Sequence, residues 1–83
     1  MLLRYKKVVA EQLKVNYSFE EGLAGGIIQL IEAGSGRLFY EGAFNGLSGE
    51  QIINTSQLNK GFYIVKVQQN ANKPVYFKIV NVN

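Results

Sequence analysis

The sequence contains no cysteine, histidine or tryptophan, and all of its acidic residues are glutamates. Without thiol and imidazole groups, the chain has no disulfide, no thiolate nucleophile, no imidazole base and none of the usual zinc ligand sets. Proline occurs once, and no segment approaches the roughly 18 consecutive apolar residues of a transmembrane helix. These absences exclude the commonest nucleophilic and metal chemistry and predict that no helix spans a membrane.

The residues that are present favour a folded chain. Apolar residues make up 47% of the 83 residues and charged residues 18%, a balance that disordered and low-complexity chains do not have. A chain of this length has room for one hydrophobic core. We therefore expect a single domain that covers residues 1–83.

The net charge of +3 is modest, and Arg4, Lys6 and Lys7 form the only basic cluster along the chain. Nucleic-acid binding depends on the number of phosphates that a concentrated basic surface neutralises, so we expect no nucleic-acid partner and keep that function only as a distant third option. The apolar start, Met1–Leu3, is too short for the apolar core of a secretory signal. If the protein is exported, this chain is expected to be a fragment or a processed piece of it.

Hydrophobic periodicity favours strands almost everywhere. From 13 to 19, apolar residues alternate strictly with polar ones, the pattern of a half-buried strand. The run 27–31 is almost continuously apolar and β-branched, which is typical of a strand covered on both faces or crossing the core. In the C-terminal third, Tyr63, Val65 and Val67 share one face of a predicted strand, and Val75, Phe77 and Ile79 form the inward face of the last one.

Further strands are expected at 37–44 and 51–55, and the segment 3–12 is read as a strand in preference to a helical turn. A short loop is expected between Glu20–Gly22 and Gly25-Gly26. Turns are expected at Gly34–Gly36, at Asn45-Gly46 with Ser48-Gly49, at Asn59–Gly61 and at 70–73. Six or seven short strands with turns about every 8–12 residues and no convincing helix indicate an all-β, antiparallel sandwich or barrel.

No set of residues predicts catalysis. Glu20 and Glu21 are adjacent, but neighbours on a strand point to opposite faces, so a solvated loop is the better interpretation. The serines have no histidine to activate them, and pairing with Lys60 or Lys66 would require burial that nothing indicates. The segment Gly34–Gly36 resembles the start of a phosphate loop but lacks the following helix. We therefore predict no catalytic, cofactor or metal site and no enzymatic activity.

Two aromatic residues are candidates for binding. Phe62 and Tyr76 fall on the strand faces opposite the predicted core, where an exposed pair can stack on sugars or receive a protein partner. The alternative is ordinary cross-strand packing within the sheet. The sequence leaves both interpretations open.

The order of the elements resembles a known family. Gly36-Arg37 precedes a strand, and residues 53–67 follow the pattern I-D-x-S-x-L-x-x-G-x-Y-x-x-K-V. The L, G, Y and K-V positions of this pattern are Leu58, Gly61, Tyr63 and Lys66-Val67. A final strand contains Lys78 and Ile79. Over about residues 13–80, the chain resembles the C-terminal sorting domains that Bacteroidetes bacteria export through the type IX secretion system. The physical roles expected of the motif are an end plug for Leu58, a turn for Gly61 and a core position for Tyr63.

The chain departs from this family at four places. Val8–Glu11 stands where a Pro-Asn-Pro-like segment is usual, and Asn54 and Asn59 replace an acidic residue and a frequent proline. The end, Asn81–Asn83, lacks the common lysine-rich terminus. The same strand pattern also occurs in other bacterial immunoglobulin-like modules.

The resemblance implies a small antiparallel immunoglobulin-like sandwich that directs secretion and cell-surface attachment of a passenger protein via the periplasm. It also implies protein partners, namely the outer-membrane export machinery and a sortase-like peptidase that removes the domain from a longer precursor. We expect Lys66 and Lys78, with Phe62 and Tyr76, to form the partner-binding surface. The alternative is an accessory adhesive module that binds a glycan or a protein through its exposed aromatics.

Overall fold

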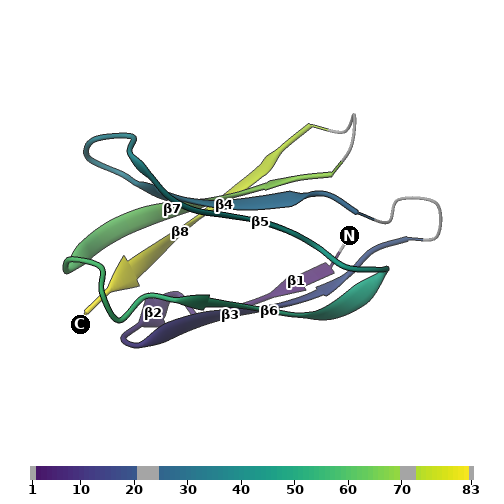
Figure 1. The fold of residues 1–83 in the computed structure, drawn as a ribbon, viewed down its shortest axis with the longest axis horizontal. Helices are drawn as coiled ribbons and strands as arrows, with labels where there is room; N and C mark the ends of the chain where they lie inside the picture. Colours follow the sequence, from purple (N-terminus) through teal and green to yellow (C-terminus); the bar gives the residue numbers. More distant parts are fainter. Residues whose placement is uncertain (1, 21–24, 70–72, 83) are drawn as a thin grey trace.

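Two β-sheets pack face to face in the computed structural model, which describes residues 2–20, 25–69 and 73–82 (Figure 1). The described residues contain eight strands and no helix: β1 (Leu2–Arg4), β2 (Val8–Val9), β3 (Gln12–Ser18), β4 (Ile27–Glu32), β5 (Leu38–Ala43), β6 (Ser48–Asn54), β7 (Gly61–Gln68) and β8 (Val75–Asn81). One sheet has the order β1-β3-β6 and the other β2-β8-β7-β4-β5. The predicted all-β sandwich is confirmed.

The core lies between the inner faces of the two sheets and follows the alternation in the sequence. Leu13, Val15 and Tyr17 of β3 face Tyr63, Val65 and Val67 of β7, and these six side chains are all buried. The other buried apolar residues are Val9, Phe19, Ile28, Leu30, Phe44, Ile53 and Ile79. Burial at every second residue of a strand is the expected result of side chains that alternate between faces.

Strand β7 is at the centre of the larger sheet. It pairs antiparallel with β8, where Tyr63 lies opposite Ile79, and with β4, where Val65 lies opposite Leu30. Strand β4 is covered on one face only, because Ile28 and Leu30 are fully buried while Ile27 is 42% exposed. The prediction of a strand covered on both faces, or crossing the core, was therefore wrong: β4 contributes one face to the core and the other to the outside of the sheet.

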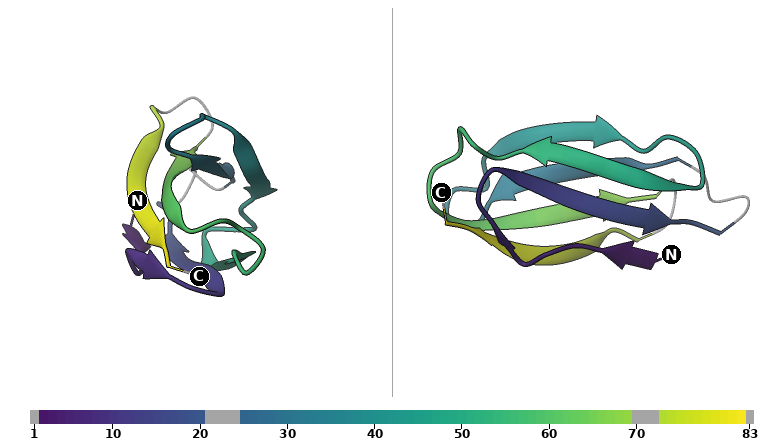
Figure 2. Two further views of the ribbon diagram at one scale, coloured as in Figure 1. Left: turned by 90° about the vertical axis from the view of Figure 1, so that its left-hand side faces the viewer. Right: turned by 90° about the horizontal axis from the view of Figure 1, so that it is seen from below.

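The N-terminal segment, predicted as one strand, contains two strands in different sheets. β1 pairs antiparallel with β3, and after a three-residue link β2 pairs parallel with β8, with Val8 opposite Val80. Figure 2 shows this segment passing from the side of β3 to the yellow strand β8. The expected six or seven strands thus become eight, and the pairing is antiparallel everywhere except between β2 and β8.

Two predicted turn glycines have backbone angles that favour glycine. Gly36 lies in the turn between β4 and β5 at φ +73°, and Gly61 begins β7 at φ +148°. Ser48-Gly49, by contrast, was predicted as a turn but belongs to β6, because Gly49 lies opposite Tyr17 and extends the ladder with β3. Most of the predicted loops at Glu20–Gly22 and 70–73 lies outside the described residues.

Candidate functional site

The four predicted partner-binding residues lie together on the outer face of β7 and β8. In the register of these strands, Lys66 is opposite Tyr76, and Phe62 is one cross-strand row from Lys78, which lies opposite Ile64. Phe62 is 56% exposed and Tyr76 58% exposed. We call Phe62, Lys66, Tyr76 and Lys78 the outer-face patch.

A cation–π contact joins two residues of the patch. The Lys78 Nζ atom lies 5.0 Å from the centre of the Phe62 ring, within the range of a favourable interaction. Beside this pair, a hollow of about 420 Å³ is bordered by Glu32, Lys60 and Gly61 as well as by Phe62 and Lys78. The patch therefore combines exposed aromatic area, two cations and a neighbouring concavity on one side of the larger sheet.

Buried hydrogen bonds hold the loop that leads into the patch. The backbone carbonyl of Asn59 accepts one hydrogen bond from the Tyr63 hydroxyl at 2.8 Å and another from the Asn81 Nδ2 group at 3.2 Å. Asn81 Nδ2 also donates to the carbonyl of Leu58 at 3.1 Å. Leu58 is half-buried and packs against the core.

The environment of Tyr63 also affects its acidity. Its side chain is 1% exposed. Burial, and to a lesser extent the negative charge of Glu32, raise the pKa of the Tyr63 phenol above its usual value of 10.0. The phenol is therefore a neutral hydrogen-bond donor that orders the loop.

Asn54 occupies the position at which the family usually has an acidic residue. Its Oδ1 atom accepts hydrogen bonds from the backbone N–H of Ser56 at 2.9 Å and from the Ser56 hydroxyl at 2.7 Å. An aspartate carboxylate accepts the same two bonds, so the substitution keeps the local turn. This explains why the departure at Asn54 does not disturb the fold.

The geometry of the patch suits binding by contact and charge. Phe62 and Tyr76 offer ring faces, and the two lysines offer donors but no acceptor. The Gly34–Gly36 segment forms the turn between β4 and β5, with the Gly36 N–H donating to the Glu32 carbonyl at 2.8 Å, and a strand follows it where a phosphate loop would need a helix. Within the described residues, no three His, Cys, Asp or Glu side chains are grouped as metal ligands.

Sequence reasoning missed one residue of this region. Asn81 is fully buried and ties the end of β8 to the loop before β7, yet it was noted only as part of an atypical terminus. Its partners are more than 20 positions away in the sequence. The only available signal was a polar residue on the inward face of the last strand, in line with Ile79.

These features define a small β-sandwich with exposed aromatic and lysine side chains on the outer face of its larger sheet. A family comparison agrees: the model of the secretion system C-terminal sorting domain matches residues 9–82, nearly the whole chain, and the chain belongs to this family. A search of curated proteins and a search of solved structures found no significant match. The resemblance seen in the sequence is confirmed.

Membership of this family establishes the function. The domain is a C-terminal sorting domain for type IX secretion of a passenger protein, and it is not an enzyme. It interacts with the secretion machinery, and the protein that carries it is secreted or attached to the surface. The described part of the chain contains no helix that is long and apolar enough to cross a membrane.

Proposed function

We propose that the outer-face patch is the surface by which this domain docks on the outer-membrane export machinery. The domain reaches that machinery from the periplasm, and a sortase-like peptidase then removes it from its passenger. The observation that carries this proposal is the exposure of two aromatic rings and of Lys78, with half-buried Lys66 beside them, on adjacent strands of one sheet.

Exposed aromatic side chains leave apolar area in contact with water, and burial of that area in an interface is favourable. Each aromatic side chain offers about 150–250 Å² for burial, and such residues supply much of the energy of protein interfaces. The lysines add an electrostatic component that favours an acidic counterpart and speeds encounter. Lys66 also lies half-buried beside Tyr76, so its charge is held close to the aromatic surface.

Export of a fusion protein tests the proposal. A signal peptide and a fluorescent passenger are placed before the domain in a bacterium that has the type IX machinery. The double variants Phe62→Thr with Tyr76→Thr, and Lys66→Gln with Lys78→Gln, keep the inner face of the sheet intact. We expect both variants to fold and to leave the passenger in the periplasm.

Matched control variants remove apolar area or positive charge at exposed positions outside the outer-face patch. Leu2 and Ile52 are 53% and 50% exposed on the smaller sheet, and their change to Thr removes comparable apolar surface. Lys7 and Lys73 are exposed, and their change to Gln removes the same charge. Both control variants are expected to export normally and to release the passenger without the domain, at the size that peptidase cleavage produces.

Two outcomes contradict the proposal. Normal export of both patch variants would show that the machinery does not read this surface. If those variants also lost binding to a polysaccharide that the wild-type domain binds, the patch would belong to the adhesive function instead.

A further inference from the structure

A second surface, unrelated to the outer-face patch, forms where the N-terminal segment changes sheets. β3 is flanked on one side by β6 along its whole length, but β1 covers its other side only from Asn16 to Ser18. The chain then leaves the sheet, and Tyr5 stacks on Phe77 of β8 with ring centres 3.8 Å apart. The edge of β3 from Gln12 to Val15 is consequently left without a ladder partner on that side.

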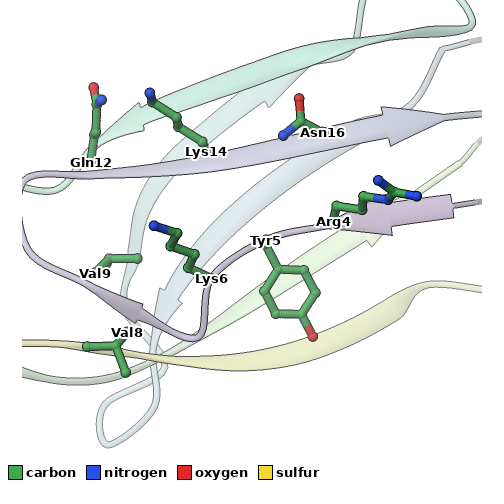
Figure 3. Close-up of a pocket in the computed structure, with 8 residues that line it drawn as sticks. All are labelled: Arg4, Tyr5, Lys6, Val8, Val9, Gln12, Lys14 and Asn16. Carbon is green, nitrogen blue, oxygen red and sulfur yellow. The ribbon is translucent and has the colours of Figure 1, made fainter.

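The uncovered edge borders a hollow of about 450 Å³ (Figure 3). Its lining residues are Arg4, Tyr5, Lys6, Val8, Val9, Gln12, Lys14 and Asn16. Lys6 points from the link between β1 and β2 toward β3, whereas Tyr5 points toward β8. The sheet switch therefore creates both the hollow and the open strand edge beside it.

The charge of this hollow has one sign. Arg4, Lys6 and Lys14 are all exposed, and its lining includes no carboxylate. The carboxylate that the strand register brings nearest on this face is Glu50, which lies opposite Asn16 on β6 and outside the lining. The basic cluster seen in the sequence is thus extended by Lys14, which the antiparallel pairing of β1 and β3 brings close to it.

The family match does not account for this surface. The match begins at residue 9, whereas Arg4, Tyr5, Lys6 and Val8 precede it. Half of the lining therefore comes from a segment outside the matched region. The hollow is a feature of this chain's own N-terminal segment packed against β3.

We propose that this hollow binds an acidic segment of a partner protein in extended conformation. Three cations in a hollow that no carboxylate lines favour carboxylates, and alternate residues of an extended peptide present their side chains on one face. The open edge of β3 offers backbone N–H and C=O groups, which a peptide pairs by adding a short strand.

The backbone edge favours a peptide over other polyanions. An anionic polysaccharide or a nucleic acid can pair with the cations, but it lacks the peptide N–H and C=O groups that would extend the sheet at β3. Three cations also neutralise few phosphates, which limits nucleic-acid affinity at physiological salt. Charge and backbone pairing together select an acidic peptide.

Fluorescence anisotropy with capped, labelled peptides tests the proposal on the full chain. The probe alternates Glu and Thr, a second peptide replaces Glu by Gln, and a third replaces Thr by Pro, which removes N–H donors but keeps every carboxylate. We expect the Glu-Thr peptide to bind. Each of the other two peptides should bind at least about tenfold more weakly, because each loses several ion pairs or ladder hydrogen bonds whose modest contributions add up.

A charge-matched pair of triple variants locates the site. Arg4→Gln, Lys6→Gln and Lys14→Gln together should reduce affinity for the Glu-Thr peptide about tenfold or more. Arg37→Gln, Lys60→Gln and Lys73→Gln remove the same charge from exposed positions outside the hollow and should leave affinity within about twofold. Circular dichroism melting checks that each variant is folded.

Four results overturn the proposal. The first is no binding of the Glu-Thr peptide, and the second is an equal loss of affinity in both triple variants. The third is binding of the Pro-containing peptide as tight as that of the Glu-Thr peptide, which would reduce the site to a charge effect. The fourth is competition by hyaluronate at equal carboxylate concentration as effective as that by the peptide, which would assign the hollow to anionic polysaccharides.

Discussion

The side chain of Asn81 illustrates how one buried amide fixes a loop. Its Nδ2 group donates to the carbonyls of Leu58 and Asn59, so it connects the last strand to the loop before β7. Its Oδ1 atom is buried without a hydrogen-bond partner. Burial of an unpaired acceptor is unfavourable, so the two donated bonds must offset that cost.

Changing Asn81 to Ala should lower the free energy of unfolding by about 1–3 kcal/mol, because the Leu58 carbonyl loses its donor and a cavity replaces the amide. Urea denaturation measures the change. Asn16→Ala, on the exposed face of β3, is the control and should stay within about 0.5 kcal/mol of the wild type. Equal stability of the two variants would show that the Asn81 bonds do not hold the loop.

The Tyr63 phenol gives a prediction about pH. Its pKa is raised in the folded state by burial and by Glu32, so the neutral form is favoured when folded. The stability from this group is therefore complete below the unfolded pKa near 10.0 and is lost as the pH rises through the folded pKa. The ultraviolet absorbance of phenolate, compared between the wild type and Tyr63→Phe, isolates this group from the other tyrosines. Ionisation of Tyr63 at or below its ordinary pKa would contradict the assignment.

Residues with local patterns were predictable, and those with distant partners were not. Tyr63, Val65 and Val67 could be placed in the core because strand periodicity alone determines their face. Phe62 and Tyr76 were correctly placed outside for the same reason. The role of Asn81 depends on carbonyls far away in the sequence, which periodicity does not reveal.

At the level of elements, β7 organises the larger sheet. From Tyr63 to Val67 it has hydrogen-bonded neighbours on both sides, β8 and β4. The pattern of residues 53–67 predicted this strand and its turn well. It did not reveal the link between β1 and β2, because that link depends on the contact of Tyr5 with Phe77 and on parallel pairing with β8.

Rates of amide hydrogen exchange should increase from the central strand β7 to the edge strands β1 and β2. Amides of β7 between Tyr63 and Val67 should exchange most slowly, because their release requires the central strand of the larger sheet to open. The amides of β1 and β2 should exchange fastest among the strands, since these elements are short and lie at sheet edges. Exchange measured by NMR tests the order, and protection of β1 equal to that of β7 would contradict the described topology.

The register of β3 and β6 shows a different limit of sequence reasoning. Ser48-Gly49 has the composition of a turn, yet the ladder continues to Ser18 opposite Ser48. Pairing with a neighbouring strand overrides the local preference of these two residues. Element boundaries set by such pairing follow from tertiary structure and not from local composition.

In the molecule as a whole, the outer-face patch and the cationic hollow lie on different parts of the sandwich. The outer-face patch lies on the outside of the larger sheet, and the cationic hollow lies at the edge where the N-terminal segment changes sheets. The four residues of the outer-face patch and the three cations of the hollow lie outside the buried core, so these side chains can be altered while the fold is kept. The domain thereby separates the residues that determine its stability from those proposed to determine its contacts.

Export of a passenger is the direct test of the sorting function. Residues 1–83 are fused behind a signal peptide and a fluorescent passenger and are expressed in two strains, one with the type IX machinery and one from which it has been deleted. We predict that the passenger reaches the surface or the medium only in the strain with the machinery, and stays in the periplasm of both strains when the domain is absent. A folded fusion that remains periplasmic in the strain with the machinery would contradict the assignment as a sorting domain.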